Sequence, residues 1–220
     1  TTRPGLRFRP LVWALLLGCI LTYPFSPAVS RPPGDKRDYI LVINTYAEST
    51  PWSRGIIADI TAHVEQIENL ELYTEHMTLL LVDSPEDIRT FETNFLREYG
   101  KKPPQALVLI GTPAALLRNF INSIWQDIPT IVCAEQDFIG PDKYYLKRQP
   151  IPASEQVPLR ALADQDNLTL LYSPAYLDQS VDLMKRILPG MNRLVFIDDA
   201  RYVNRQTEHD LAELLGSQYP

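Results

Sequence analysis

Tyr39-Ile-Leu-Val-Ile-Asn44, followed closely by Thr50-Pro-Trp-Ser53, is the stretch from which the fold class of this chain can be argued. An almost uninterrupted apolar run of this length is typical of a strand that is buried on both faces of a parallel sheet. Thr50 is suited to cap a helix and Pro51 to occupy its first turn. Apolar residues then recur at helical spacing, at Ile56, Ile60, Val64 and Ile67. The stretch therefore predicts a parallel strand that leads into an amphipathic helix.

The same strand-then-helix unit recurs along the chain. Ser84-Pro85 and Thr112-Pro113 are helix starts of the same kind as Thr50-Pro51. The limits of the second strand stay open, because residues 70–77 and 78–82 both qualify. Further strands are predicted at residues 106–110, 130–133, 168–172 and 194–197, and further helices from 173–174 to 188 and around 211–215. This alternation predicts an α/β fold with a doubly wound parallel sheet.

Residues 1–30 have the pattern of a secretory signal peptide. Three arginines precede an apolar stretch at residues 11–23, which is too short to span a bilayer comfortably. Small residues on either side of Val29 offer a cleavage site. An uncleaved N-terminal anchor is the alternative, and a lipoprotein signal that ends at Cys19 is a third interpretation. Residues 31–37 are then predicted to be a linker.

Composition and charge argue against several function classes. The chain has 220 residues, of which 45% are hydrophobic, and its net charge is −6. This is the balance of an ordinary globular protein, and it disfavours a disordered chain or a basic nucleic-acid binder. Residues 1–37 carry a net charge of +5 and the remainder of the chain −11, and an acidic body behind a basic leader favours export over a phosphate-binding surface.

The topology also predicts where a ligand would bind. Right-handed crossovers bring the carboxyl ends of parallel strands to one edge of a sheet, and ligands bind at that edge. The loops expected there are residues 45–53, 111–113, 134–137 and 198–202. Tyr46 and Trp52 could stack on a small ligand while offering a donor, although Trp52 could instead anchor the start of the helix. The helix N-termini at Pro51 and Pro113 favour an anionic group on that ligand.

No catalytic or metal-binding motif is visible. The sequence holds no GxGxxG or GxxxxGK loop and no HExxH, CxxC or GxSxG spacing, and its three histidines are scattered. Cys133 is predicted to be a small buried hydrophobe. Asp198-Asp199 could be a pair of carboxylates at a cleft, but a role in a turn or as an N-cap competes with that interpretation. No catalytic residue, metal ligand or cofactor is therefore predicted in this chain.

Several motifs, taken in chain order, resemble the ABC-transporter substrate-binding-like sensor regions of membrane-bound bacterial sensor histidine kinases, including hybrid ones. The stretch from Tyr39 to Tyr46, with Pro51-Trp-Ser53 and Ile56, resembles the opening of that family. Residues 71–77 are similar to its second strand, and residues 129–137 to its fourth strand and the loop that follows. Residues 183–191 and 194–198, with Arg201-Tyr202, resemble the start of its second lobe. The resemblance covers residues 38–220.

The resemblance implies a fold like that of the type I periplasmic binding proteins, in which two α/β lobes enclose a ligand cleft. By this comparison, residues 38–137 form the first lobe, 138–167 an irregular connecting segment, and 168–220 the crossover and the truncated start of a second lobe. The ligand-contacting loops of the family would correspond to these residues of this chain: Thr45, Tyr46, Trp52, Ser53, Gly111, Thr112, Ala134, Glu135 and Asp198.

The function implied by the resemblance is the sensing of an unknown small molecule in the periplasm by a two-component histidine kinase, which signals through cleft closure. The parent kinase would be a membrane-bound homodimer that uses ATP and acts on a response regulator or a fused receiver. This chain would be its N-terminal fragment, with no cofactor and no nucleic acid bound. A free periplasmic solute-binding protein of an ABC importer is the alternative. A secreted enzyme is a third class, which the missing catalytic motifs disfavour.

Overall fold

The computed structural model describes residues 37–77, 82, 84–163 and 167–218, so the predictions for residues 1–36 lie outside the described residues. At the centre of the fold is a five-stranded sheet whose strands all run parallel, in the lateral order β2-β1-β3-β4-β7. The strands are β1 (Asp38–Asn44), β2 (Leu70–His76), β3 (Ala106–Ile110), β4 (Thr130–Ala134) and β7 (Leu168–Tyr172). The second strand thus matches the earlier of the two segments left open by the sequence.

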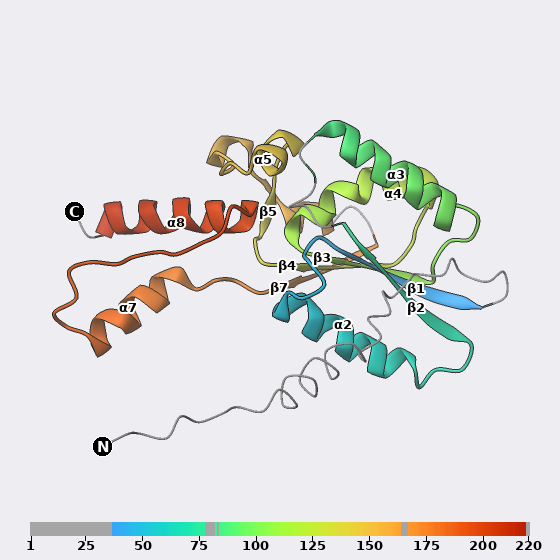
Figure 1. Cartoon of the computed structure of the whole chain (residues 1–220), viewed down its shortest axis with the longest axis horizontal. Coiled ribbons are helices and arrows are strands. Elements are labelled where there is room, and N and C mark those ends of the chain that lie inside the picture. The colour runs from blue at the N-terminus through green and yellow to red at the C-terminus, as the bar shows by residue number, and fades with distance from the viewer. Residues whose placement is uncertain (1–36, 78–81, 83, 164–166, 219–220) are drawn as a thin grey trace, which may run out of the picture. The chain divides into compact units, whose positions relative to one another are not determined.

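Helices cover both faces of this sheet (Figure 1). Helix α2 (Pro51–Val64) packs on one face, and α3 (Pro85–Tyr99) and α4 (Arg118–Ile124) pack on the other. The lateral direction in which successive strands are added reverses between β1 and β3. This reversal is the hallmark of a doubly wound sheet. The predicted α/β class, with a parallel sheet flanked by helices, is confirmed.

The face under α3 and α4 carries the larger core. Tyr39, Leu41 and Ile43, which alternate along β1, are fully buried on it. Phe95 of α3 packs against four other aromatic rings at centroid distances of 5.3 to 5.9 Å. Edge-on and tilted pairs of this kind are favourable beyond the area that they bury. The aromatic cluster therefore fixes α3 and α4 against the sheet.

The face under α2 carries a smaller core. Val42, Val108, Ile110 and Cys133 are buried on it, and isoleucines of α2 pack against them. Burial raises the pKa of the Cys133 thiol. The prediction that Cys133 is a small buried hydrophobe is confirmed.

Residues 138–163 contain more regular structure than the irregular segment predicted for residues 138–167. They form a two-stranded antiparallel ribbon of β5 (Phe138–Ile139) and β6 (Val157–Pro158), with α5 (Asp142–Lys147), a 3-10 turn (Ala153–Glu155) and α6 (Leu159–Ala163). Pro141 and Pro152 stand at the N-caps of α5 and of the 3-10 turn, so these prolines delimit short elements. Ile151 and Leu159 are fully buried and anchor the segment.

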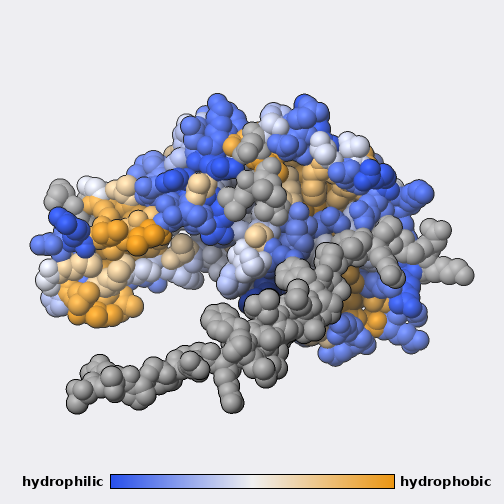
Figure 2. Space-filling view, in the orientation of Figure 1, coloured by the Kyte–Doolittle hydropathy of each residue, from blue (hydrophilic) through white to orange (hydrophobic). Residues whose placement is uncertain are grey.

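The region after β7 differs from the prediction in two respects. Helix α7 (Leu177–Ile187) begins later than Ser173-Pro174, and residues 194–197 form no strand before α8 (Tyr202–Gln218). A strand needs a neighbour for its backbone N–H and C=O groups, and residues 194–197 pair with none of the described strands. Val195 and Ile197 are 70% and 89% exposed. Figure 2 shows hydrophobic side chains gathered over α7 and the segment that follows it.

Candidate functional site

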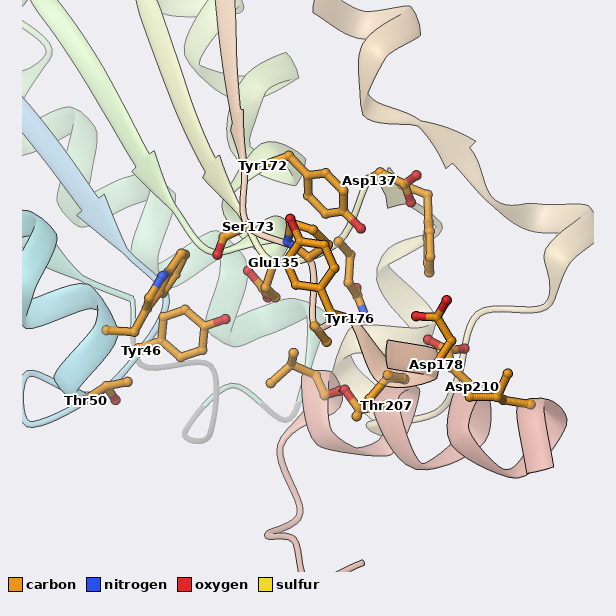
Figure 3. Close-up of a pocket in the computed structure, with 18 residues that line it drawn as sticks. Tyr46, Thr50, Glu135, Asp137, Tyr172, Ser173, Tyr176, Asp178, Thr207 and Asp210 are labelled. Carbon is orange, nitrogen blue, oxygen red and sulfur yellow. The ribbon is translucent and has the colours of Figure 1, made fainter. Parts of the chain in front are cut away.

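A cavity of about 670 Å³ lies at the carboxyl edge of the sheet (Figure 3). Its walls come from the segments that follow β1, β4 and β7 and from one side of α8. Ligands of doubly wound proteins bind at this edge of the sheet, and the volume is within the range of small-molecule sites. The cavity is therefore the candidate functional site.

The segment after β1 is held in place by Asn44, whose side chain is fully buried. Its Oδ1 accepts the backbone N–H of Tyr46 at 3.0 Å, and its Nδ2 donates to Oγ of Ser53 at 3.3 Å. The rings of Tyr46 and Trp52 meet edge to face at a centroid distance of 5.7 Å. The two rings therefore form one part of the cavity wall, and the hydrogen bonds of Asn44 fix the backbone that carries them.

Gly111 allows the ends of β1 and β3 to approach closely behind this wall. Its φ is +95°, which L side chains rarely adopt. A Cβ at this position would stand 2.1 Å from Oγ1 of Thr45 and 3.0 Å from the ring of Tyr46. The Thr45 hydroxyl is itself fixed, because it donates to the carbonyl of Ile110 at 3.0 Å. Only glycine therefore leaves room for Thr45 and Tyr46.

Glu135, which directly follows β4, links the loop after β4 to the loop after β3. Its Oε2 accepts the backbone N–H of Thr112 at 3.0 Å, while the Thr112 hydroxyl accepts the backbone N–H of Gln136 at 3.1 Å. Oε1 of Glu135 and Oε1 of Gln136 are enclosed, and neither accepts a hydrogen bond from the described residues. Burial raises the pKa of Glu135, opposed by the nearby hydroxyl of Tyr46 and N–H of Thr112. Burial and the adjacent Glu135 carboxyl raise the pKa of Tyr46.

The segment after β7 presents two more rings, those of Tyr172 and Tyr176. It begins with the N–H of Ser173, which donates to the carbonyl of Ala134 at 2.9 Å and extends the ladder past the strand. Tyr176 stands in the left-handed region, with φ 48° and ψ 45°, at the N-cap of α7. This conformation costs a non-glycine residue about 1–2 kcal/mol, and such strain concentrates at functional sites.

Helix α8 forms the opposite wall and is anchored by Gln206, which is fully buried. Its Oε1 accepts the backbone N–H of Ile151 at 2.8 Å, and its Nε2 donates to Asp210 at 2.8 Å. The ring of Tyr202 packs on Tyr145 of α5 at a centroid distance of 4.3 Å. These contacts turn one side of α8 to the cavity, and the residues on that side are Val203, Thr207, Asp210 and Leu214.

The residues that the sequence placed at the site fall into three groups. Tyr46, Trp52 and Glu135 line the cavity. Asp198 does not line it and faces Arg205 instead, at 3.5 Å. The remaining predicted residues are buried and support the loops from behind; they are Thr45, Ser53, Gly111, Thr112 and Ala134.

Sequence reasoning missed two parts of the lining. One is the segment Ser173–Asp178, although the rule that gave the other edge loops applies equally to the end of β7. The other is α8, for which no local signal exists, because its position depends on the contact between Gln206 and Ile151. In the described part of the chain, no three His, Cys, Asp or Glu side chains stand close enough to hold a metal ion.

The fold and the cavity define the class of this protein as a Rossmann-like α/β protein with a candidate small-molecule site at the carboxyl edge of its parallel sheet. Comparison with protein-family models, with curated proteins and with solved structures gave no match. A search of the described helices for one long and apolar enough to cross a membrane found none.

Proposed function

We propose that this chain is part of a type I periplasmic-binding-protein-like sensor region of a two-component histidine kinase and that it binds a small ligand at the carboxyl edge of its sheet. The observation that carries the proposal is the cavity between the sheet edge and α8. Tyr46, Trp52 and Glu135 would contact the ligand from one wall, and Thr207 and Asp210 from the other.

The arrangement of the walls supports signalling through closure. A ligand shifts a conformational equilibrium only by its differential affinity for the two states. A molecule held between the segments after β1 and β7 on one side and α8 on the other would contact both walls only when they are together. Such a ligand would therefore favour the closed arrangement. The motif resemblance over residues 38–220 is the reason to propose that this movement occurs on the periplasmic side of a kinase.

The binding part of the proposal is tested with a metabolite library on the whole chain, read by thermal shift and then by hydrogen exchange. A ligand present at 100 times its Kd stabilises by about 2.7 kcal/mol, which raises the Tm by about 5–10 °C for a chain of this size. The expected pattern is simultaneous protection of residues 46–52, 172–178 and 203–214. Protection of one wall alone would contradict closure, and a library without any binder would contradict the binding function.

The sensor part of the proposal is tested by the coding sequence downstream of codon 220. A further α/β lobe, then an apolar run of about 20 residues, then kinase modules would support a membrane-bound homodimeric kinase that uses ATP. A reading frame that stops after one further lobe would instead support a free solute-binding protein of an importer.

A further inference from the structure

We propose that the ligand of this cavity is an organic cation that carries an amine or quaternary ammonium group. The inference rests on the proposed function and names the chemical class of its ligand. It is argued from the acidic charge of the lining, from two oxygen atoms without a hydrogen-bond donor, and from the aromatic rings of the lining.

The charged groups of the lining are all acidic. Four carboxyl groups face the cavity, from Glu135, Asp137, Asp178 and Asp210, and the described lining includes no lysine, arginine or histidine. Asp137 and Asp210 both act on the ring of Tyr172, and with burial they raise its pKa. Like charges gathered around one partly buried space repel each other, and a bound cation would relieve that repulsion.

The nearest cationic side chains are engaged elsewhere. Arg201 is close enough to influence Tyr46, but its Nε lies 2.8 Å from a carboxylate oxygen of Asp199. His209 is adjacent to Asp210, and its Nε2 lies 3.4 Å from Glu213. Burial raises the pKa of Asp210 and His209 lowers it in part, so His209 offsets some of the negative charge, but no cationic side chain belongs to the described lining itself.

The unpartnered oxygen atoms are a separate observation that also indicates a ligand. The side chain of Gln136 belongs to a residue only 8% exposed, and its Oε1 accepts no hydrogen bond from the described residues. Oε1 of Glu135, the preceding residue, likewise accepts no hydrogen bond from the described residues. A buried acceptor without a donor costs about 1–3 kcal/mol. The N–H groups of a protonated amine donate and never accept, so they suit a lining whose unpaired polar atoms are acceptors. A quaternary ammonium group has no N–H and would gain only from the carboxyl groups and the rings.

Aromatic rings stand between the acidic groups. In the view of Figure 3, the rings of Tyr172 and Tyr176 lie between Glu135 on one side and Asp178 with Asp210 on the other. Tyr46 and Trp52 add two further rings to the lining. The faces of such rings attract cations, and clusters of them recognise quaternary ammonium groups.

The helix N-termini at Pro51 and Pro113 were expected to favour an anionic group on the ligand. The structure weakens that expectation for the helix that begins at Thr112. At Thr112 the backbone N–H already donates to Oε2 of Glu135, so this donor is not free for an anionic ligand. A helix N-terminus contributes about half of an elementary charge, whereas each ionised carboxylate contributes a full one. The charge of the lining therefore opposes binding of an anion.

The test compares ligands that share a skeleton and differ in charge. Phenethylamine, 2-phenylethanol and 3-phenylpropanoate are the matched cationic, neutral and anionic probes, used beside choline, spermidine and the metabolite library sorted by charge. Binding to the whole chain is measured by calorimetry. We expect cations alone to bind with a Kd below about 1 mM.

Variants that replace a carboxyl group by a carboxamide test whether cation binding depends on the lining. Asp210→Asn should weaken cation binding about tenfold, because it removes one charge from a partly buried position, and Asp178→Asn should weaken it less, because Asp178 is exposed. Asp59→Asn is the matched control, since it makes the same change on an exposed position of α2 and should alter the Kd less than twofold. Thermal melts of all three variants confirm that they are folded.

Each result has a definite meaning. Cation binding that the lining variants weaken and Asp59→Asn does not would support the inference. Equal or tighter binding of neutral or anionic compounds, or binding of Mg²⁺ or Mn²⁺ alone, would overturn the inference and leave the cavity as a binding site. A library in which no compound of any charge binds would overturn the proposed function itself.

Discussion

Substituting alanine for Gly111 tests whether close packing of the β1 and β3 ends shapes the site. The new Cβ would lie 2.1 Å from Oγ1 of Thr45, so the hydroxyl must move and its 3.0 Å bond to the Ile110 carbonyl would break. The lost hydrogen bond costs about 1 kcal/mol, and a φ of +95° costs alanine about 1–3 kcal/mol. The expected destabilisation is therefore about 2–4 kcal/mol.

Urea unfolding of the whole chain measures this effect. With an m value of about 2 kcal/mol/M, the midpoint should fall by about 1–2 M. Gly55→Ala is the matched control, because Gly55 lies inside α2 with nothing within 4 Å of its added Cβ. Alanine is favoured over glycine in a helix interior, so the control should gain up to about 1 kcal/mol.

A double variant separates the clash from the backbone strain. Thr45→Ala removes the atom that the new Cβ would meet, so Gly111→Ala should cost less in that background than in the natural chain. The backbone part of the cost should remain. A Gly111→Ala variant within about 0.5 kcal/mol of the Gly55→Ala control would refute the reasoning, as would strictly additive costs in the double variant.

Three further predictions concern the core, the buried carboxyl group and the strained tyrosine. Phe95→Ala should cost about 3–5 kcal/mol in urea unfolding, because Phe95 packs against four rings; a cost below about 1 kcal/mol would contradict that packing. Folding raises the pKa of Glu135, so ionisation of this group destabilises the fold as the pH rises above its unfolded pKa. Glu135→Gln should therefore unfold at higher urea than the natural chain at about pH 8, and the difference should shrink towards about pH 4. At position 176 the usual preference should invert: Tyr176→Gly should be more stable than Tyr176→Ala by about 1 kcal/mol, and the opposite order would contradict the left-handed backbone.

Strands β1 and β3 could be predicted from the sequence because each is a short apolar run that precedes a helix start, whereas β2 carries charged residues and its limits stayed open. The same reasoning failed where an apolar run has no neighbouring strand to pair with. Residues 194–197 are as apolar as β3, yet they form no strand, since no described strand lies beside them. Local pattern identifies a segment that can be a strand, and only the neighbouring backbone decides whether it becomes one.

The position of the site could be predicted, but the roles of its residues could not. The rule for parallel sheets located the edge, and Tyr46, Trp52 and Glu135 do line the cavity there. Thr45 stands next to Tyr46 in the sequence, yet its hydroxyl bonds to the carbonyl of Ile110 in the adjacent strand. Sequence alone does not distinguish the neighbour that lines a cavity from the neighbour that supports it.

Features of this edge that cost stability add support to a binding role when they are taken together with the cavity. Tyr176 has a strained backbone, and Oε1 of Gln136 and of Glu135 are buried without a donor. Each feature costs on the order of 1–3 kcal/mol, and a sequence shaped for stability alone would replace them. Costs of the same kind also occur elsewhere in the described chain, because Asn69, Asp127 and Arg148 have positive φ and an oxygen atom of Asp198 is buried without a hydrogen bond. A ligand in the cavity would offset part of the cost at this edge, because it would contact the ring that the strained backbone presents.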